Sequence, residues 1–133
     1  MFKFIDYLLA LALLITLATP NISRAQDSPE SLIGTWRLDM SPENSEDNNF
    51  AMMEITAVKG RSFSGTFYRE GVAIRSGLIN TQTGKVYGAL ISGDGTGEYY
   101  TSFYLEDGRL VGTTHAPGRN FLSTWIANKV EDE

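Results

Sequence analysis

The sequence predicts an all-β protein: a closed, eight-stranded antiparallel up-and-down barrel preceded by a signal peptide. From Ile33 onward, short runs of aromatic and β-branched residues alternate with glycine-bearing turns at about the 8–12-residue spacing typical of meanders. No run repeats its apolar residues with a helical period for long enough to compete. An apolar segment of the kind that directs export opens the chain.

The N-terminal segment has the composition of a signal peptide. A continuously apolar run over residues 7–18 follows Lys3 and precedes the small-residue pattern Ser23-Arg24-Ala25. We expect cleavage after residues 1–25 and a periplasmic or secreted protein. The run is shorter than the roughly 20 residues that span a bilayer. An uncleaved anchor is the alternative, because Asp6 is unusual in a basic leader.

The length of 133 residues suits one domain with one core. Residues 26–32 are expected to be a flexible N-terminal segment, residues 33–130 the β-barrel domain, and residues 131–133 an acidic tail. The chain has no cysteine, so neither a disulfide nor a lipidated cysteine can hold it or anchor it. Strand pairing and packing must therefore provide its stability.

The net charge of −5 narrows the classes of partner. Removal of the leader takes away Lys3, Arg24 and Asp6, which makes the chain one charge more negative. Nucleic acids and anionic lipid surfaces bind basic patches. We therefore expect no nucleic-acid partner, and no membrane contact after signal cleavage.

Eight strands are expected, joined by glycine-bearing turns, with one long loop at residues 40–49. The predicted strands are Ile33–Asp39, Phe50–Lys59, Ser62–Tyr68, Val72–Asn80, Lys85–Ser92, Glu98–Leu105, Arg109–Ala116 and Phe121–Val130. Pairing of the first strand with the last would remove both exposed edges, which favours a barrel. A two-sheet sandwich is the alternative.

Alternation along the strands predicts which side chains point inward. Trp36 and Leu38 share one face of the first strand, Phe63 and Phe67 one face of the third, and Trp125 faces inward in the eighth. Residues 86–91 and 99–105 instead carry apolar or aromatic groups on both faces. A partner or a second copy could cover the outward side. The alternative is a monomer with ordinary exposed tyrosines.

Two short motifs resemble the calycin group, and most closely its avidin and streptavidin branch. Gly34-Thr35-Trp36 opens the first strand, and the segment at residues 63–68 (FSGTFY) forms the third. In that group a Gly-x-Trp motif begins the first strand, its tryptophan plugs one end of the barrel, and a Gly-Thr-Tyr segment lies in the third strand. The resemblance implies an eight-stranded barrel with a pocket at its mouth. Likeness to the lipocalin branch rests on Gly-x-Trp alone.

The same resemblance argues against biotin as the ligand. The biotin site of those proteins resembles a cage of several tryptophans, whereas this chain has only Trp36 and Trp125. Leu38 stands where those proteins carry a polar contact, and Phe67 stands where they carry a tyrosine hydroxyl. A buried ureido group left unpaired would cost about 1–3 kcal/mol per group. We therefore predict no biotin binding.

Residues suited to catalysis or metal binding are few. His115 is the only histidine, no nucleophile elbow accompanies it, and we expect it at the rim of the barrel. Zinc would need more histidine or cysteine, and the segment Gly93–Gly97 lacks the ligands of a calcium loop. Glu54 and Arg75 form an ion pair or a ligand anchor only if both point inward. We expect no enzyme activity, no metal and no cofactor.

The sequence therefore favours a binding module. A small apolar or amphipathic ligand would occupy the barrel interior. The residues expected to line it are Trp36, Leu38, Phe63, Phe67, Phe103 and Trp125. The alternative is an interaction or oligomeric protein with a filled core, which docks through outward tyrosines.

Overall fold

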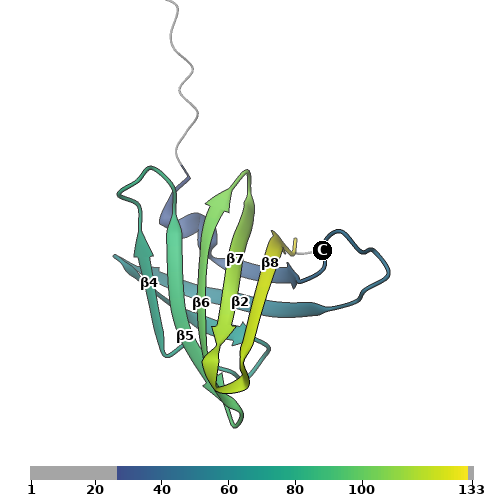
Figure 1. Cartoon of the computed structure of the whole chain (residues 1–133). Helices are drawn as coiled ribbons and strands as arrows, with labels where there is room; N and C mark the ends of the chain where they lie inside the picture. The colour runs from purple at the N-terminus through teal and green to yellow at the C-terminus, as the bar shows by residue number, and fades with distance from the viewer. Residues whose placement is uncertain (1–26, 132–133) are drawn as a thin grey trace, which may run out of the picture.

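The computed structural model describes residues 27–131, in which eight antiparallel strands close into one barrel (Figure 1). Each strand pairs with its neighbours along the chain, and Figure 1 shows β4 to β8 side by side while β2 crosses behind them. The strands are β1 (Gly34–Asp39), β2 (Phe50–Lys59), β3 (Ser62–Tyr68), β4 (Ser76–Asn80), β5 (Tyr87–Asp94), β6 (Gly97–Glu106), β7 (Arg109–Ala116) and β8 (Phe121–Lys129). Two short 3-10 helices, η1 (Pro29–Leu32) and η2 (Pro117–Arg119), precede β1 and join β7 to β8.

Pairing of β1 with β8 closes the barrel and confirms the predicted topology. Trp36 lies opposite Lys129, and Leu38 lies opposite Ala127. Because every strand then has two neighbours, the sheet has no free edge on which another chain could add. The sandwich alternative is excluded.

Two predicted segments differ from the structure, and the pairing of β2 with β3 is irregular. Residues 72–75 are not a strand: β4 begins at Ser76, and only an isolated bridge joins Thr66 to Ala73. The register between β2 and β3 shifts after Ile55, and Gly65 lies opposite that shift, so the chain bends here instead of continuing a regular ladder. The segment Gly93–Gly97, expected to be a loop, belongs mostly to β5 and β6, with only two residues left in the turn.

The barrel holds a buried aromatic core, with the predicted inward faces of β1, β3 and β8 confirmed. Trp36, Leu38, Phe63, Phe67 and Trp125 are all buried. Glycines on β5 and β7, the two strands that flank β6, make room for the largest rings. A Cβ atom at Gly112 would lie 2.5 Å from the Trp125 ring, and one at Gly88 would overlap the Phe103 ring. The rings can therefore lie flat against the sheet.

The end of the barrel at which β1 begins is closed by η1. Residues 26–32 were expected to be flexible, but Pro29–Leu32 form this 3-10 helix and the Leu32 side chain is completely buried. The Leu32 carbonyl accepts a hydrogen bond from Trp36 Nε1 at 2.8 Å, and Lys129 Nζ lies 5.0 Å above the Trp36 ring. The proposed leader, residues 1–25, lies outside the described residues. Across residues 27–131, no helix is both long enough and apolar enough to cross a membrane.

Candidate functional site

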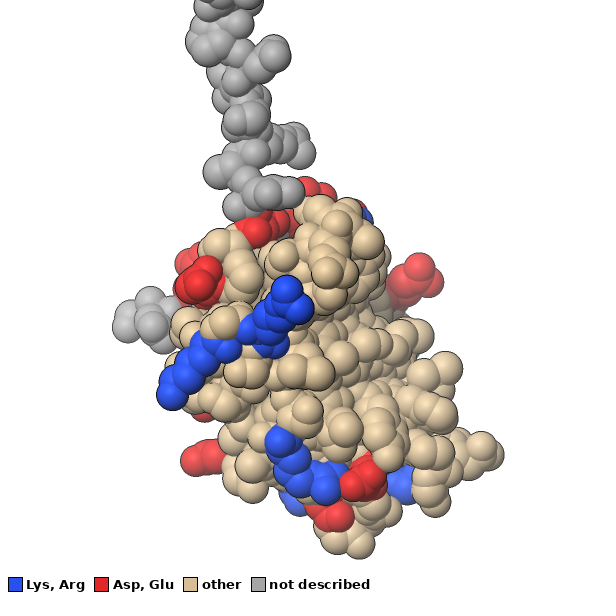
Figure 2. Space-filling model, turned by 90° about the vertical axis from the view of Figure 1, so that its left-hand side faces the viewer, with Lys and Arg blue, Asp and Glu red and all other residues tan. Residues whose placement is uncertain are grey.

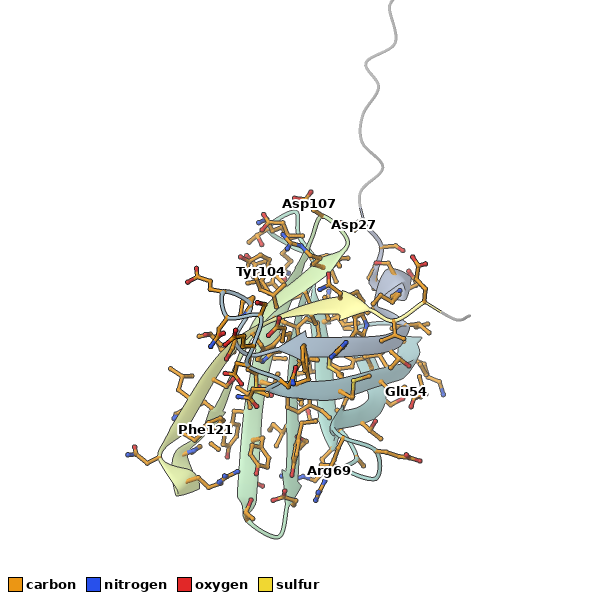
Figure 3. All side chains as sticks on the ribbon, turned by 90° about the vertical axis from the view of Figure 1, so that its right-hand side faces the viewer. Asp27, Glu54, Arg69, Tyr104, Asp107 and Phe121 are labelled. Atoms are coloured by element: carbon orange, nitrogen blue, oxygen red, sulfur yellow. The ribbon has the colours of Figure 1, made fainter. Side chains whose placement is uncertain are left out.

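The opposite end of the barrel holds a recess of about 320 Å³, here called the mouth recess. Figure 3 shows Phe121 and Arg69 at this end, away from Asp27 and Asp107 at the closed end. The β1–β2 loop, the end of β3, the start of β6, η2 and the start of β8 surround the opening. Its lining residues are Leu38, Met40, Asn49, Phe50, Ala51, Phe67, Tyr68, Tyr99, Thr114, Arg119, Phe121, Ser123 and Trp125.

Aromatic rings form the floor of the mouth recess. The ring centroids of Phe67 and Trp125 are 6.5 Å apart, and Phe103 packs beneath Trp125 at 6.3 Å. Phe63 contacts Phe103 edge to face at 5.9 Å, further toward the closed end. Side chains therefore fill the barrel between this floor and the closed end, and the mouth recess lies on the other side of the floor.

The deeper polar groups are mostly paired with one another. Trp125 Nε1 donates to Thr114 Oγ1 at 3.0 Å, and the Thr114 hydroxyl is 3.0 Å from that of Thr101. These bonds hold the indole plane in place and satisfy its only donor. Ser123 is also buried and lines the recess beside Trp125. Its side chain is therefore placed where a bound molecule would contact it.

A chain of hydrogen bonds crosses the rim. Arg119 Nη1 donates to Tyr99 Oη at 2.9 Å, and Tyr99 Oη lies 2.9 Å from Thr96 Oγ1. Thr96 Oγ1 in turn donates to Asp94 Oδ1 at 2.5 Å. The network ties η2 to the β5–β6 turn at the rim.

Asp94 is held as a carboxylate. Its oxygens accept hydrogen bonds from the hydroxyls of Thr96 and Tyr68, and from the Thr96 backbone N–H. These bonds, the Thr96 hydroxyl first, lower the pKa of Asp94 well below its usual range. The same contact raises the pKa of Tyr68, because ionised Tyr68 would face a negative carboxylate. At ordinary pH, Tyr68 therefore serves Asp94 as a neutral donor.

Only some of the residues predicted to line a ligand site line the mouth recess, and the others lie in the packed core. Leu38, Phe67 and Trp125 line the mouth recess together. Phe103 and Phe63 lie in the core below the floor, and Trp36 lies under η1 at the closed end. The prediction treated the whole interior as one cavity, whereas aromatic packing separates it into a filled part and an open part.

Sequence reasoning missed most of the rim. Arg119 lies in a connection, where no alternation assigns a direction to a side chain. Tyr99 belongs to a run with aromatic residues on both faces, so its inward orientation had no clear signal. Phe121 and Ser123 precede Trp125 in β8 by four and two residues, so strand alternation puts them on the same face, and both line the recess.

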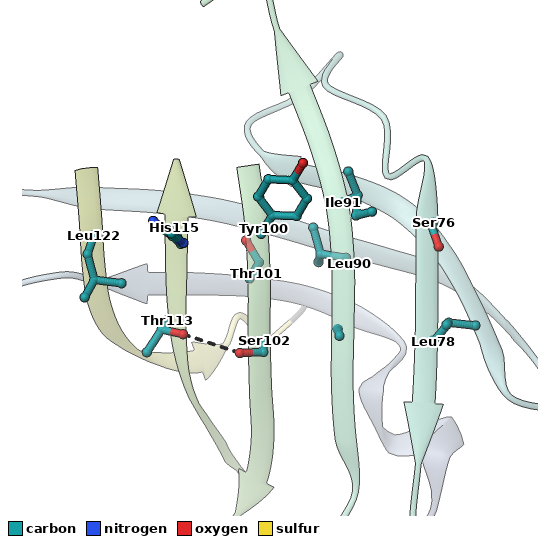
Figure 4. Close-up of a pocket in the computed structure, with 11 residues that line it drawn as sticks. Ser76, Leu78, Leu90, Ile91, Tyr100, Thr101, Ser102, Thr113, His115 and Leu122 are labelled. Carbon is teal, nitrogen blue, oxygen red and sulfur yellow. Dashed lines mark hydrogen bonds between the residues drawn. The ribbon is translucent and has the colours of Figure 1, made fainter. Parts of the chain in front are cut away.

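A second hollow of about 590 Å³ lies on the outside of the sheet (Figure 4). Its floor is the outward face of β4 to β8, here called the outer face, and Leu78 and Leu122 stand at its two sides. These leucines are 60% and 65% exposed. Tyr100 and Ile91 add apolar surface between them. The apolar character expected for both sides of β5 and β6 is thus present outside the barrel.

Two ion pairs within the chain lie at the two ends of the outer face. Arg75 contacts Glu98 at 2.6 Å, and Lys85 contacts Glu106 at 3.0 Å. Figure 2 looks onto the side where β4 runs and shows a broad uncharged area between charged side chains. The area between these two ion pairs is therefore largely uncharged.

The remaining candidate residues lie apart from the mouth recess. His115 is exposed on the outer face, one residue before β7 ends at Ala116. Glu54 is exposed, and Arg75 pairs with Glu98 instead, so the inward ion pair of Glu54 with Arg75 does not form. Residues 27–131 contain no cluster of three or more side chains of the types that hold metals.

Comparison of the chain with protein-family models, with curated proteins and with solved structures yields no match.

Proposed function

We propose that this protein is a non-catalytic binding protein that takes up a small amphipathic molecule in the mouth recess. It would act after export, in a periplasm or outside the cell. The resemblance of its first and third strands to the calycin group is consistent with a role of this kind. Leu38 and Phe67 both line the recess and offer no polar contact, so biotin stays an unsuitable ligand.

The observation that carries this proposal is the composition of the recess. Three aromatic or aliphatic side chains, Phe67, Trp125 and Leu38, supply an apolar floor, while hydroxyls and one guanidinium converge on it from the rim. Binding sites for small molecules combine mainly apolar walls with a few placed polar groups. At about 320 Å³ the recess is at the small end of such sites, which limits the ligand to a compact molecule.

The test uses three probes that share a phenylbutyl tail: 4-phenylbutan-1-ol, 4-phenylbutanoate and 4-phenylbutylammonium. We expect at least one of them to shift the indole N–H signal of Trp125 saturably in NMR titrations. The indole of Trp36 is an internal control, because it lies under η1 at the closed end and should not move.

A matched pair of variants locates the binding. Ser123→Leu fills part of the recess and should weaken binding at least about tenfold, since even one misplaced group in a packed site costs about 1–3 kcal/mol. Thr124→Leu changes the next residue of β8, which is exposed, and should leave binding unchanged. Absence of a saturable shift with all three probes, or equal shifts of both indoles, would contradict the proposal.

A second candidate function is self-association through the outer face. Leu78, Ile91, Tyr100 and Leu122 line one hollow on this face, and the two ion pairs at its ends give a second copy both signs of charge to meet. An isologous dimer would stack the two faces and cover Leu78 and Leu122. Tyrosine and leucine there suit an interface core.

Light scattering and native mass spectrometry test this second candidate. The wild-type chain should be a dimer at micromolar concentration, and Leu122→Glu should raise the dissociation constant at least about tenfold by placing an unpaired charge in the interface. Ile33→Glu, at an exposed apolar residue outside this face, should have no effect. A wild-type monomer at about 1 mM would exclude the dimer.

A further inference from the structure

We infer that the mouth recess selects a ligand with an anionic head group, of the carboxylate class, which the Arg119 guanidinium binds at the rim. This inference rests on the proposed binding function and specifies its ligand. The apolar tail would point down to Trp125 and Phe67, because they form the floor.

Arg119 is the only charged side chain among the described residues that line the recess. Within residues 27–131 no carboxylate lies within ion-pairing distance of it, whereas Arg69, Arg75 and Lys85 each have one. Its guanidinium carries five N–H donors, and its one hydrogen bond in the structure goes to Tyr99. The geometry therefore leaves a cation with spare donors beside an apolar recess, which is the arrangement that binds a carboxylate with charge-assisted bonds.

Tyr99 positions the Arg119 guanidinium at the rim of the recess. Tyr99 is only 4% exposed. Its hydroxyl oxygen accepts the hydrogen bond from Arg119, and its hydroxyl proton is directed to Thr96. The Arg119 carbon Cζ also lies 5.7 Å from the centre of the Phe121 ring. Arg119 is an exposed residue, and these two contacts restrain a long side chain that would otherwise lose more entropy on binding.

Negative groups near the opening do not occupy the same position. The Asp94 carboxylate is turned to Tyr68 and Thr96 and lies 4.0 Å from Arg69, so its charge is balanced without Arg119. The acidic side chains of the β1–β2 loop, Glu43, Glu46 and Asp47, are exposed and do not line the recess. Dissolved ions screen the electrostatic interaction of such exposed charges with Arg119 beyond about 8 Å at physiological ionic strength.

The three phenylbutyl probes separate the head groups, because their tails are identical. The carboxylate should bind at least about tenfold more tightly than the alcohol, and the ammonium should bind most weakly. Arg119→Gln should weaken carboxylate binding about tenfold or more and change alcohol binding less than about twofold. Tyr99→Phe should weaken carboxylate binding by a smaller factor, since it removes the group that positions Arg119.

Arg109→Gln is the matched control, because it removes the same charge from an exposed residue at the closed end of β7. It should leave all three affinities unchanged, and thermal unfolding should show that each variant is folded. If none of the three probes binds, the proposed function fails. If the alcohol or the ammonium binds as tightly as the carboxylate, or if Arg119→Gln affects them equally, binding stands and the anionic head group is wrong.

Discussion

Replacement of Trp36 with alanine is expected to lower the free energy of unfolding by about 3–5 kcal/mol. The side chain is 1% exposed and belongs to the central core cluster. Its removal would leave a cavity under η1 and would leave the Leu32 carbonyl without the indole donor 2.8 Å away. It would also remove the ring beneath Lys129, whose Nζ donates to the Ser31 carbonyl at 2.6 Å.

Urea unfolding followed by far-ultraviolet circular dichroism measures this loss without relying on tryptophan fluorescence. Trp36→Phe keeps most of the apolar volume and should cost less than the alanine variant. Leu122→Ala, at the most exposed leucine of the outer face, should change the stability of the monomer by no more than about 0.5 kcal/mol. A Trp36→Ala loss below about 1 kcal/mol would show that the tryptophan does not close this end.

Replacement of Gly65 with alanine is expected to be about as damaging, with a loss of about 3 kcal/mol or more. An added Cβ atom would overlap the Glu54 carbonyl oxygen and lie 2.8 Å from the Glu54 carbonyl carbon. Those atoms are backbone of the neighbouring strand and cannot turn away as a side chain would. The φ of +154° adds strain for a residue with a Cβ atom. The variant must therefore separate β2 from β3 at their bend.

Two other glycines separate the two causes of this loss. Gly71→Ala keeps a positive φ of 85° but has open space around the new Cβ atom, so only backbone strain should appear, at about 1 kcal/mol. Gly118→Ala has neither feature and should be close to neutral. Denaturant midpoints of the three variants give the comparison. If Gly65→Ala were no worse than Gly71→Ala, the close approach of the two strands would not be needed for folding.

Alternation and turn residues were enough to predict the barrel and much of its interior. Trp36, Phe63 and Trp125 each stand in a run where inward and outward residues alternate, and burial of the apolar set fixes the register of such a strand. Closure of β1 on β8 followed from the cost of leaving strand edges unpaired. The bend near Gly65 was not predictable, because it depends on a register shift in the neighbouring strand.

The sequence by itself determined that this chain is an eight-stranded tube with an aromatic interior, because strand periodicity is a local property that each run carries independently. Only the tertiary structure decided which part of that interior stays open. Gly88 and Gly112 let Phe103 and Trp125 lie across the barrel, with Trp125 in the floor of the recess and Phe103 beneath it. The helix η2 brings Arg119 to Tyr99 at the rim. Such contacts join residues far apart along the chain, and no local pattern encodes the distance between them.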